Sequence, residues 1–193
     1  MLGLWAAFLP NVKPHLEKLS NKDLITLVNY NQRYVSVDDI AKALMQKDQF
    51  LLLIDVRNPQ QYKEFTLPGA INIPVDSILN PSNLQILSGS DVYNIVFFSN
   101  GTSLADKAWL IATTTGIKNL HVLKGGLNAW FNQLLQPKRP PDWAKQAEFK
   151  KYEFRKAAAR FFTGATSVEQ SSSNAPVKVQ VPVKKKQVGG GCE

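Results

Sequence analysis

The sequence has little cysteine and little histidine. Cys192 is the only cysteine among 193 residues, and the two histidines are His15 and His121. A single cysteine cannot form an intramolecular disulfide and cannot supply a cysteine-based metal cluster. We therefore expect no metal site and no cofactor, and we expect the chain to reside in a reducing compartment, the cytoplasm.

Long apolar runs are also missing. The opening run from Leu2 to Leu9 (LGLWAAFL) is too short to span a bilayer, and no basic residue precedes it, so it is neither a convincing transmembrane helix nor a secretory signal. Two interpretations stay open. The run is an apolar strip packed on the core, or it makes a peripheral membrane contact, because Leu, Trp and Phe favour a membrane interface.

Acidic residues are fewer than basic ones, 15 against 23, and the formal net charge is +8. The basic residues gather in the last third of the chain, from Lys138 to Arg160 and at Lys184, Lys185 and Lys186. The globular part has neither an aromatic stacking platform among basic residues nor a recognition-helix or zinc-knuckle pattern. We therefore do not expect nucleic acid as a partner.

Three apolar runs predict strands: residues 50–56 (FLLLIDV), 94–98 (NIVFF) and 120–123 (LHVL). Runs without polar alternation are typical of strands buried on both faces of a parallel sheet. Helical or loop stretches separate them, so the order β, α, β, α, β predicts an α/β fold, an open twisted parallel sheet with helices on both faces. Ligands of such sheets lie beyond the carboxyl ends of the strands, here at the loop after Phe98.

Capping patterns and composition predict the rest of the organisation. Ser20 and Ser36 are each followed three residues later by Asp, which predicts two capped helices. Prolines at 137, 140 and 141 precede a helix expected over 142–162, whose apolar stripe Trp143, Ala147, Tyr152 and Phe161 is predicted to pack on the domain. Serine, valine, lysine and glycine then predict a disordered basic tail. The expected units are an arm (1–33), a domain (34–136), an appended helix (137–163) and a tail (164–193).

Three blocks of the chain resemble the rhodanese-like (rhodanese homology domain) family over about residues 34–135. They are Asp55-Val56-Arg57, residues 67–74 (LPGAINIP) and residues 123–130 (LKGGLNAW). We interpret Asp55 and Arg57 as structural, and the pair Gly125 and Gly126 as a tight turn between a strand and a helix.

The resemblance also locates the family's active loop, Cys-x-x-Gly-x-Arg followed by Ser, at the six residues Ser99, Asn100, Gly101, Thr102, Ser103 and Leu104, followed by Ala105. The loop length matches, but Ser99 stands where the family has its cysteine. Thr102 stands at the glycine position, Leu104 at the arginine position and Ala105 at the serine position. The resemblance therefore implies the fold of a sulfurtransferase with a degenerate loop.

Sulfur transfer needs a thiolate of low pKa, held in a nest of amides, that can carry sulfane sulfur as a persulfide. A serine hydroxyl cannot hold a persulfide, and no histidine lies near Ser99 in the sequence to act as its base. We therefore expect a catalytically inactive module that acts in protein interaction or regulation, with an unidentified protein partner. Its loop either holds a small anion such as sulfate, phosphate or a carboxylate, or is a solvated turn.

Cys192 leaves an alternative open. The tail is long enough to bring this thiol to the loop, so the chain could be a sulfurtransferase or sulfur carrier that uses Cys192 or a partner's cysteine. The carboxylates of Glu193 and of the chain end disfavour the Cys192 thiolate, which favours a thiol without a catalytic role.

Overall fold

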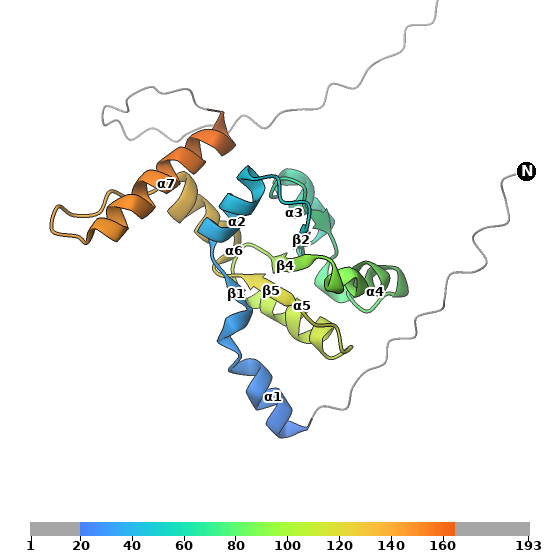
Figure 1. The fold of residues 1–193 in the computed structure, drawn as a ribbon. Helices are drawn as coiled ribbons and strands as arrows, with labels where there is room; N and C mark the ends of the chain where they lie inside the picture. The colour runs from blue at the N-terminus through green and yellow to red at the C-terminus, as the bar shows by residue number, and fades with distance from the viewer. Residues whose placement is uncertain (1–19, 165–193) are drawn as a thin grey trace, which may run out of the picture.

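Five parallel strands form one sheet in the computed structural model, which describes residues 20–164 (Figure 1). The strands are β1 (Tyr34–Val35), β2 (Leu51–Asp55), β3 (Ile71–Asn72), β4 (Asn94–Phe98) and β5 (Leu120–Leu123), in the spatial order β1-β5-β4-β2-β3. The three predicted strands are confirmed, β4 and β5 with the predicted ends. The two edge strands were not predicted, because two residues are too few to show a periodic pattern.

Seven α-helices and four other helical turns connect the strands within the described residues. The helices are α1 (Asn21–Val28), α2 (Val37–Met45), α3 (Pro59–Glu64), α4 (Pro81–Leu87), α5 (Ser103–Thr113), α6 (Gly126–Ala129) and α7 (Gln146–Thr163). The turns are η2 (Asn31–Arg33), η3 (Val75–Ser77), η4 (Ser88–Asp91) and the π-helical η5 (Trp130–Leu135). Both predicted capping boxes are present, at Ser20 and at Ser36.

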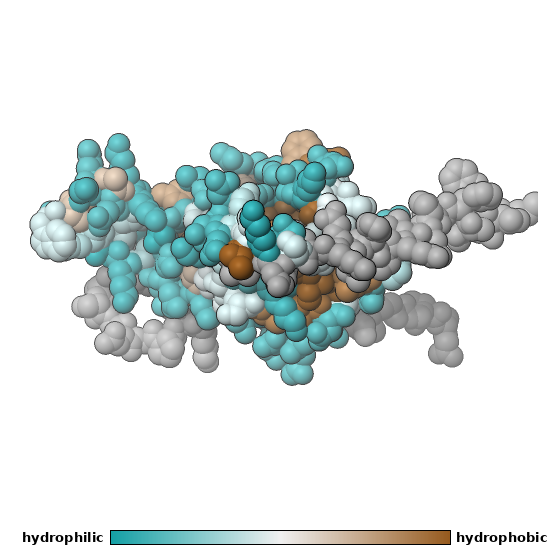
Figure 2. Space-filling model, turned by 90° about the horizontal axis from the view of Figure 1, so that it is seen from below, coloured by the Kyte–Doolittle hydropathy of each residue, from teal (hydrophilic) through white to brown (hydrophobic). Residues whose placement is uncertain are grey.

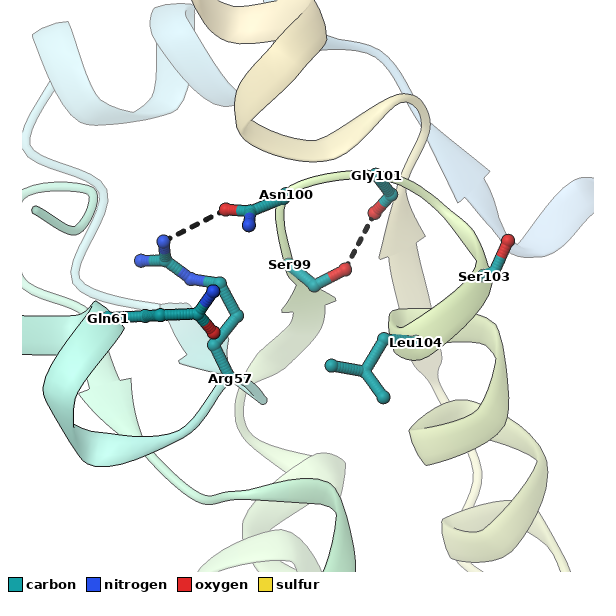
Figure 3. A pocket seen from close by; sticks show the side chains of 7 residues that line it. All are labelled: Arg57, Gln61, Ser99, Asn100, Gly101, Ser103 and Leu104. Carbon is teal, nitrogen blue, oxygen red and sulfur yellow. Dashed lines mark hydrogen bonds between the residues drawn. The ribbon is translucent and has the colours of Figure 1, made fainter.

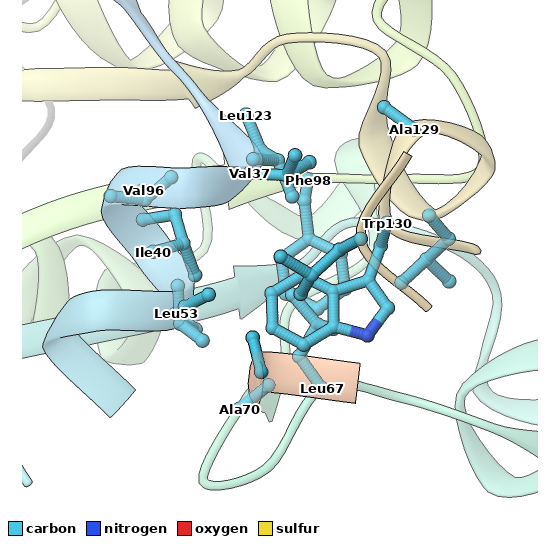
Figure 4. Close-up of a cluster of buried hydrophobic side chains, with 14 residues drawn as sticks. Val37, Ile40, Leu53, Leu67, Ala70, Val96, Phe98, Leu123, Ala129 and Trp130 are labelled. Atoms are coloured by element: carbon cyan, nitrogen blue, oxygen red, sulfur yellow. The ribbon is translucent and has the colours of Figure 1, made fainter. Parts of the chain in front are cut away.

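The core lies on both faces of the sheet, as predicted. On one face, strand side chains such as Leu53, Val96 and Phe98 pack against α2, η5 and α7 (Figure 4). On the other face, the alternate residues Ile95 and Phe97 pack against α4 and α5. Because successive side chains of a strand point to opposite faces, β4 contributes to both layers, and its carboxyl end is fixed from both sides.

The appended helix α7 packs on the domain, but the predicted apolar stripe was wrong. The helix begins at Gln146, so Trp143 precedes it and is 87% exposed, and Phe161 is also exposed. The residues that contact the core are Ala158, which is buried, with Phe154 and Phe162 partly buried. These three are four residues apart and therefore share one helix face, which the predicted set did not.

Several predictions fall outside the described residues. These are the predictions on residues 2–9, the tail after Gly164 and Cys192, and they stay predictions. Between residues 20 and 164, no helix combines the length and the apolar character that crossing a bilayer requires.

Candidate functional site

The topology makes a crevice between the carboxyl ends of β2 and β4. These two strands are neighbours, but the chain leaves β2 towards β3 on one side and leaves β4 towards β5 on the other. Such a switch point separates the two outgoing loops and leaves a space between them. A hollow of about 370 Å³ lies there, lined by Arg57, Gln61, Ser99, Asn100, Gly101, Ser103 and Leu104 (Figure 3).

Five of the six residues predicted from the loop line this hollow, and Thr102 does not. The other two lining residues come from the β2 side. Arg57 was interpreted as structural only, and Gln61 was not singled out. The signal that could have found Gln61 is the strand order, because a switch point between β2 and β4 brings the first turn of α3 to face the loop.

Ser99 follows β4 directly and is 2% exposed. Its hydroxyl donates a hydrogen bond to the carbonyl oxygen of Gly101, at 2.8 Å (Figure 3). The serine proton is therefore bound within the loop, and no described base accepts it. The arrangement is that of a neutral alcohol.

His121 is not placed to act as a base for Ser99. It pairs with Val96, which lies three residues before Ser99, about 10 Å away along the strand direction. Burial lowers the pKa of His121 and thus favours its neutral form, and its Nδ1 has no hydrogen-bond partner within residues 20–164. His121 therefore lies within β5 and away from the loop.

The turn before α6 holds the loop. The amides of Leu127 and Asn128 donate to the carbonyl oxygens of Ser99 and Asn100, both at 2.9 Å. A Cβ atom on Gly126 would lie 2.2 Å from the Ser99 oxygen, so only glycine allows this approach. Gly125 and Gly126 have φ of 77° and 54°, and the predicted tight turn is present.

Thr102 acts in the same support. Its Oγ1 accepts a hydrogen bond from the Gly125 amide at 2.9 Å, which explains why its side chain does not line the hollow. The residue at the family's glycine position thus connects the loop to the turn before α6.

Asp55 and Arg57 form a buried pair at the β2 side of the hollow. Arg57 donates to the Asp55 carboxylate through Nε at 3.0 Å and through Nη2 at 2.6 Å, and Asp55 is fully buried. The Arg57 Nη1 donates to Asn100 Oδ1 at 3.0 Å, and Thr66 Oγ1 donates to Asp55 Oδ2 at 2.9 Å. Asp55 therefore compensates the Arg57 charge, while Arg57 fixes the loop through Asn100.

The loop amides are the remaining polar groups. Within the described part of the chain, the N–H groups from Asn100 to Ala105 donate no hydrogen bond. Helix α5 begins at Ser103, and its N-cap residue Thr102 supplies no side-chain cap. Unpaired amides at a helix N-terminus attract anions, and Leu104 adds an apolar wall in place of a cation.

Residues 36–133 match the rhodanese-like domain. The chain belongs to the rhodanese-like domain family. Among curated relatives, the adenylyltransferase and sulfurtransferase UBA4 of Meyerozyma guilliermondii is 32% identical over 119 residues, which cover 58% of this chain and 26% of that protein. The thiosulfate:glutathione sulfurtransferase of Saccharomyces cerevisiae is 24% identical over 109 residues, or 52% of this chain and 78% of that protein.

Solved structures show the same kind of similarity. A human single-domain sulfurtransferase is 22% identical, with a TM-score of 0.40, over 52% of this chain and 96% of that one. The chain spans about a quarter of the length of the adenylyltransferase relative named above. The family match gives the chain the rhodanese-like fold and makes it a homologue of the sulfurtransferases named above.

Proposed function

We propose that this rhodanese domain does not transfer sulfur through its own loop and that it acts as a protein-interaction or regulatory module with a protein partner. The observation that carries the proposal is the oxygen of Ser99 at the base of the hollow, with its proton donated to Gly101. A thiolate is the nucleophile that sulfur transfer needs, and an alcohol held as a neutral donor cannot carry a persulfide. Under this proposal the chain keeps the rhodanese fold but does not catalyse sulfur transfer.

Sulfur transfer from thiosulfate to cyanide by the full chain tests the proposal. We expect no rate above background for the wild type. The double variant Ser99→Cys with Leu104→Arg should gain activity, because the loop keeps its length and its support from α6. Ser99→Ala with Leu104→Arg is the matched control without sulfur and should stay inactive. A wild-type rate far above background, or a persulfide trapped on the wild-type chain during turnover, would contradict the proposal.

The loop itself is proposed to bind a small anion. The six amides from Asn100 to Ala105 that donate no hydrogen bond support this role. The charge of Arg57 is already compensated by Asp55, so the amides supply most of the attraction. Sulfate, phosphate and a carboxylate share the required chemistry.

Leu104 offers a graded test of anion binding, because it lines the hollow and is only partly buried. Sulfate affinity is measured by calorimetry for the wild type and for Leu104→Glu, Leu104→Gln and Leu104→Arg. We expect Glu to weaken sulfate binding by at least about tenfold and Arg to strengthen it by about as much, since each changes one charge near the anion. Gln is the neutral control and should resemble the wild type. If all four chains bind sulfate equally, the anion does not lie at this loop.

A second candidate is a sulfurtransferase or sulfur carrier in which Cys192 or a partner's cysteine supplies the nucleophile. Relatives of the chain that are named as sulfurtransferases favour this candidate. The thiolate would take the sulfane sulfur of thiosulfate and release sulfite, and cyanide would then remove that sulfur as thiocyanate. Activity of the wild type that Cys192→Ala abolishes would select this function.

We further propose a cytoplasmic location, since one cysteine allows no intramolecular disulfide. A peripheral membrane contact through residues 2–9 also stays a proposal. Cosedimentation with anionic vesicles that is lost when residues 2–9 are deleted would support that contact.

A further inference from the structure

The net charge of the described chain lies in one appended segment. Residues 137–164, which comprise the proline-containing turn and α7, carry eight Lys and Arg against three Asp and Glu, a net charge of +5. Residues 20–136 carry nine of each and are neutral. We call residues 137–164 the basic arm. In Figure 2 hydrophilic side chains cover most of the end of the molecule that α7 forms.

The basic arm contains a second hollow, of about 400 Å³. The proline turn contributes Lys138 and Arg139 to its lining, and α7 contributes Lys151, Tyr152 and Arg155. Glu148 is the one acidic residue of the lining. The hollow is therefore concave and predominantly positive, which is the arrangement that recognises carboxylates.

The cations that α7 contributes are held in place by Asp38 of α2. Asp38 accepts two hydrogen bonds from Arg155, at 2.8 and 2.9 Å, and lies 3.3 Å from the Lys151 ammonium. Arg155 is 16% exposed at its side chain and is thus preorganised. Lys138, across the hollow, has no carboxylate within 4.0 Å among residues 20–164. Asp38 compensates one of the two charges of Lys151 and Arg155, and Arg139 pairs with Asp142 at 2.9 Å. An incoming carboxylate would therefore meet the charge of Lys138 and the remaining charge of the Lys151 and Arg155 pair.

Trp143 lies in the same turn and is 87% exposed. The turn lies at the outer end of α7, away from the sheet (Figure 1). Trp and Arg are the residues that most often dominate the binding energy of protein interfaces, whereas an indole left in water stabilises nothing. Trp143 does not line the hollow, but it belongs to the turn that does, and its exposed indole is accessible to another molecule.

We propose that the basic arm docks an acidic, extended segment of a partner protein, with carboxylates in the hollow and an apolar side chain against Trp143. A membrane fits the arm less well, because the exposed residues of α7 include Glu148 and Glu153 and form no apolar row. A single nucleic acid strand also fits less well, since it needs several stacking aromatics along a groove. The proposal does not depend on the chemistry of Ser99.

Fluorescence anisotropy of a fluorescein-labelled peptide, in which one leucine is flanked by four glutamates on each side, tests the docking with the full chain. The double variant Lys138→Glu with Arg139→Glu should weaken binding by at least about tenfold, because both charges line the hollow. Trp143→Ala should weaken it by about fivefold without loss of folding, since the side chain is exposed.

Two charge-matched controls distinguish an effect of the basic arm on binding from an effect of the net charge of the chain. Lys107→Glu with Lys118→Glu reverses two exposed lysines of the neutral body, and Lys185→Glu with Lys186→Glu reverses two lysines of the tail. Each should change the affinity by less than about twofold. Equal losses for the arm and for either control would overturn the proposal. So would binding to phosphatidylserine vesicles or to a thymidine oligonucleotide that is tighter than binding to the peptide and is lost in Trp143→Ala.

Discussion

Replacing Gly126 by alanine should dislodge the loop that forms the hollow. The new Cβ would lie 2.2 Å from the Ser99 oxygen, 2.7 Å from the Gly101 oxygen and 3.0 Å from the Asn100 carbonyl carbon. All three are backbone atoms, so no flexible side chain can move aside. The loop must shift, or the hydrogen bonds from the turn before α6 must break.

The magnitude follows from two separate costs. The φ of 54° at Gly126 costs an alanine about 1 kcal/mol or slightly more. The close approach adds about 2 kcal/mol, as overpacking of a well-filled site does. Gly126→Ala should therefore reduce the free energy of unfolding by about 3 kcal/mol, which lowers Tm by roughly 10 °C for a domain of this size.

Alanine variants of two other glycines measure the backbone strain and the close approach separately. Gly69 has a φ of 74°, but no atom lies within 4 Å of the position that a Cβ would take there, so Gly69→Ala should cost only the backbone strain, about 1 kcal/mol. Gly101 lies in the loop itself, has no positive φ and has the same open space, so Gly101→Ala should be neutral or stabilise by up to about 1 kcal/mol. Urea unfolding measures all three variants. If Gly126→Ala is no less stable than Gly69→Ala, the turn before α6 does not support the loop.

Two further predictions concern buried carboxylates. Thr66→Val should destabilise the fold by about 2 kcal/mol in urea unfolding, because it removes a donor to the buried Asp55 carboxylate, whereas Thr66→Ser should retain most of the stability. Burial raises the pKa of Asp38, but hydrogen bonds and charge from Arg155 and Lys151 outweigh it and hold this pKa below its usual value. A lowered pKa gives stability that is present above about pH 4 and lost as the pH falls further, so Asp38→Asn should be less stable at neutral pH and should lose less stability on acidification.

The sheet was predictable where the strands are long and buried. Residues 94–98 and 120–123 form β4 and β5 as their apolar runs predict, because a strand covered on both faces needs apolar residues at every position. The short edge strands β1 and β3 depend on their neighbours for pairing and have no pattern of their own. Tertiary context also decided which face of α7 is buried, since Arg155 has its carboxylate partner Asp38 at a distance of 117 residues in the sequence.

The site was predictable in its residues but not in their roles. The position of the loop after β4 followed from the sequence, and five of its six residues line the hollow. That Thr102 turns away to accept a hydrogen bond from Gly125 could not be predicted, because the two residues meet only when β5 pairs with β4. Likewise, the contact of Arg57 with Asn100 depends on the pairing of β2 with β4.

These contacts separate the shape of the loop from its chemistry. Thr102, Asn100 and the backbone of Ser99 are fixed by partners that need neither a sulfur atom at the first position nor a cation at the sixth. In a loop with a thiolate, the converging amides would stabilise that thiolate. With a neutral hydroxyl that donates to Gly101, the same amides have no anion of their own. This arrangement supports the proposal that the site binds a ligand that carries a negative charge.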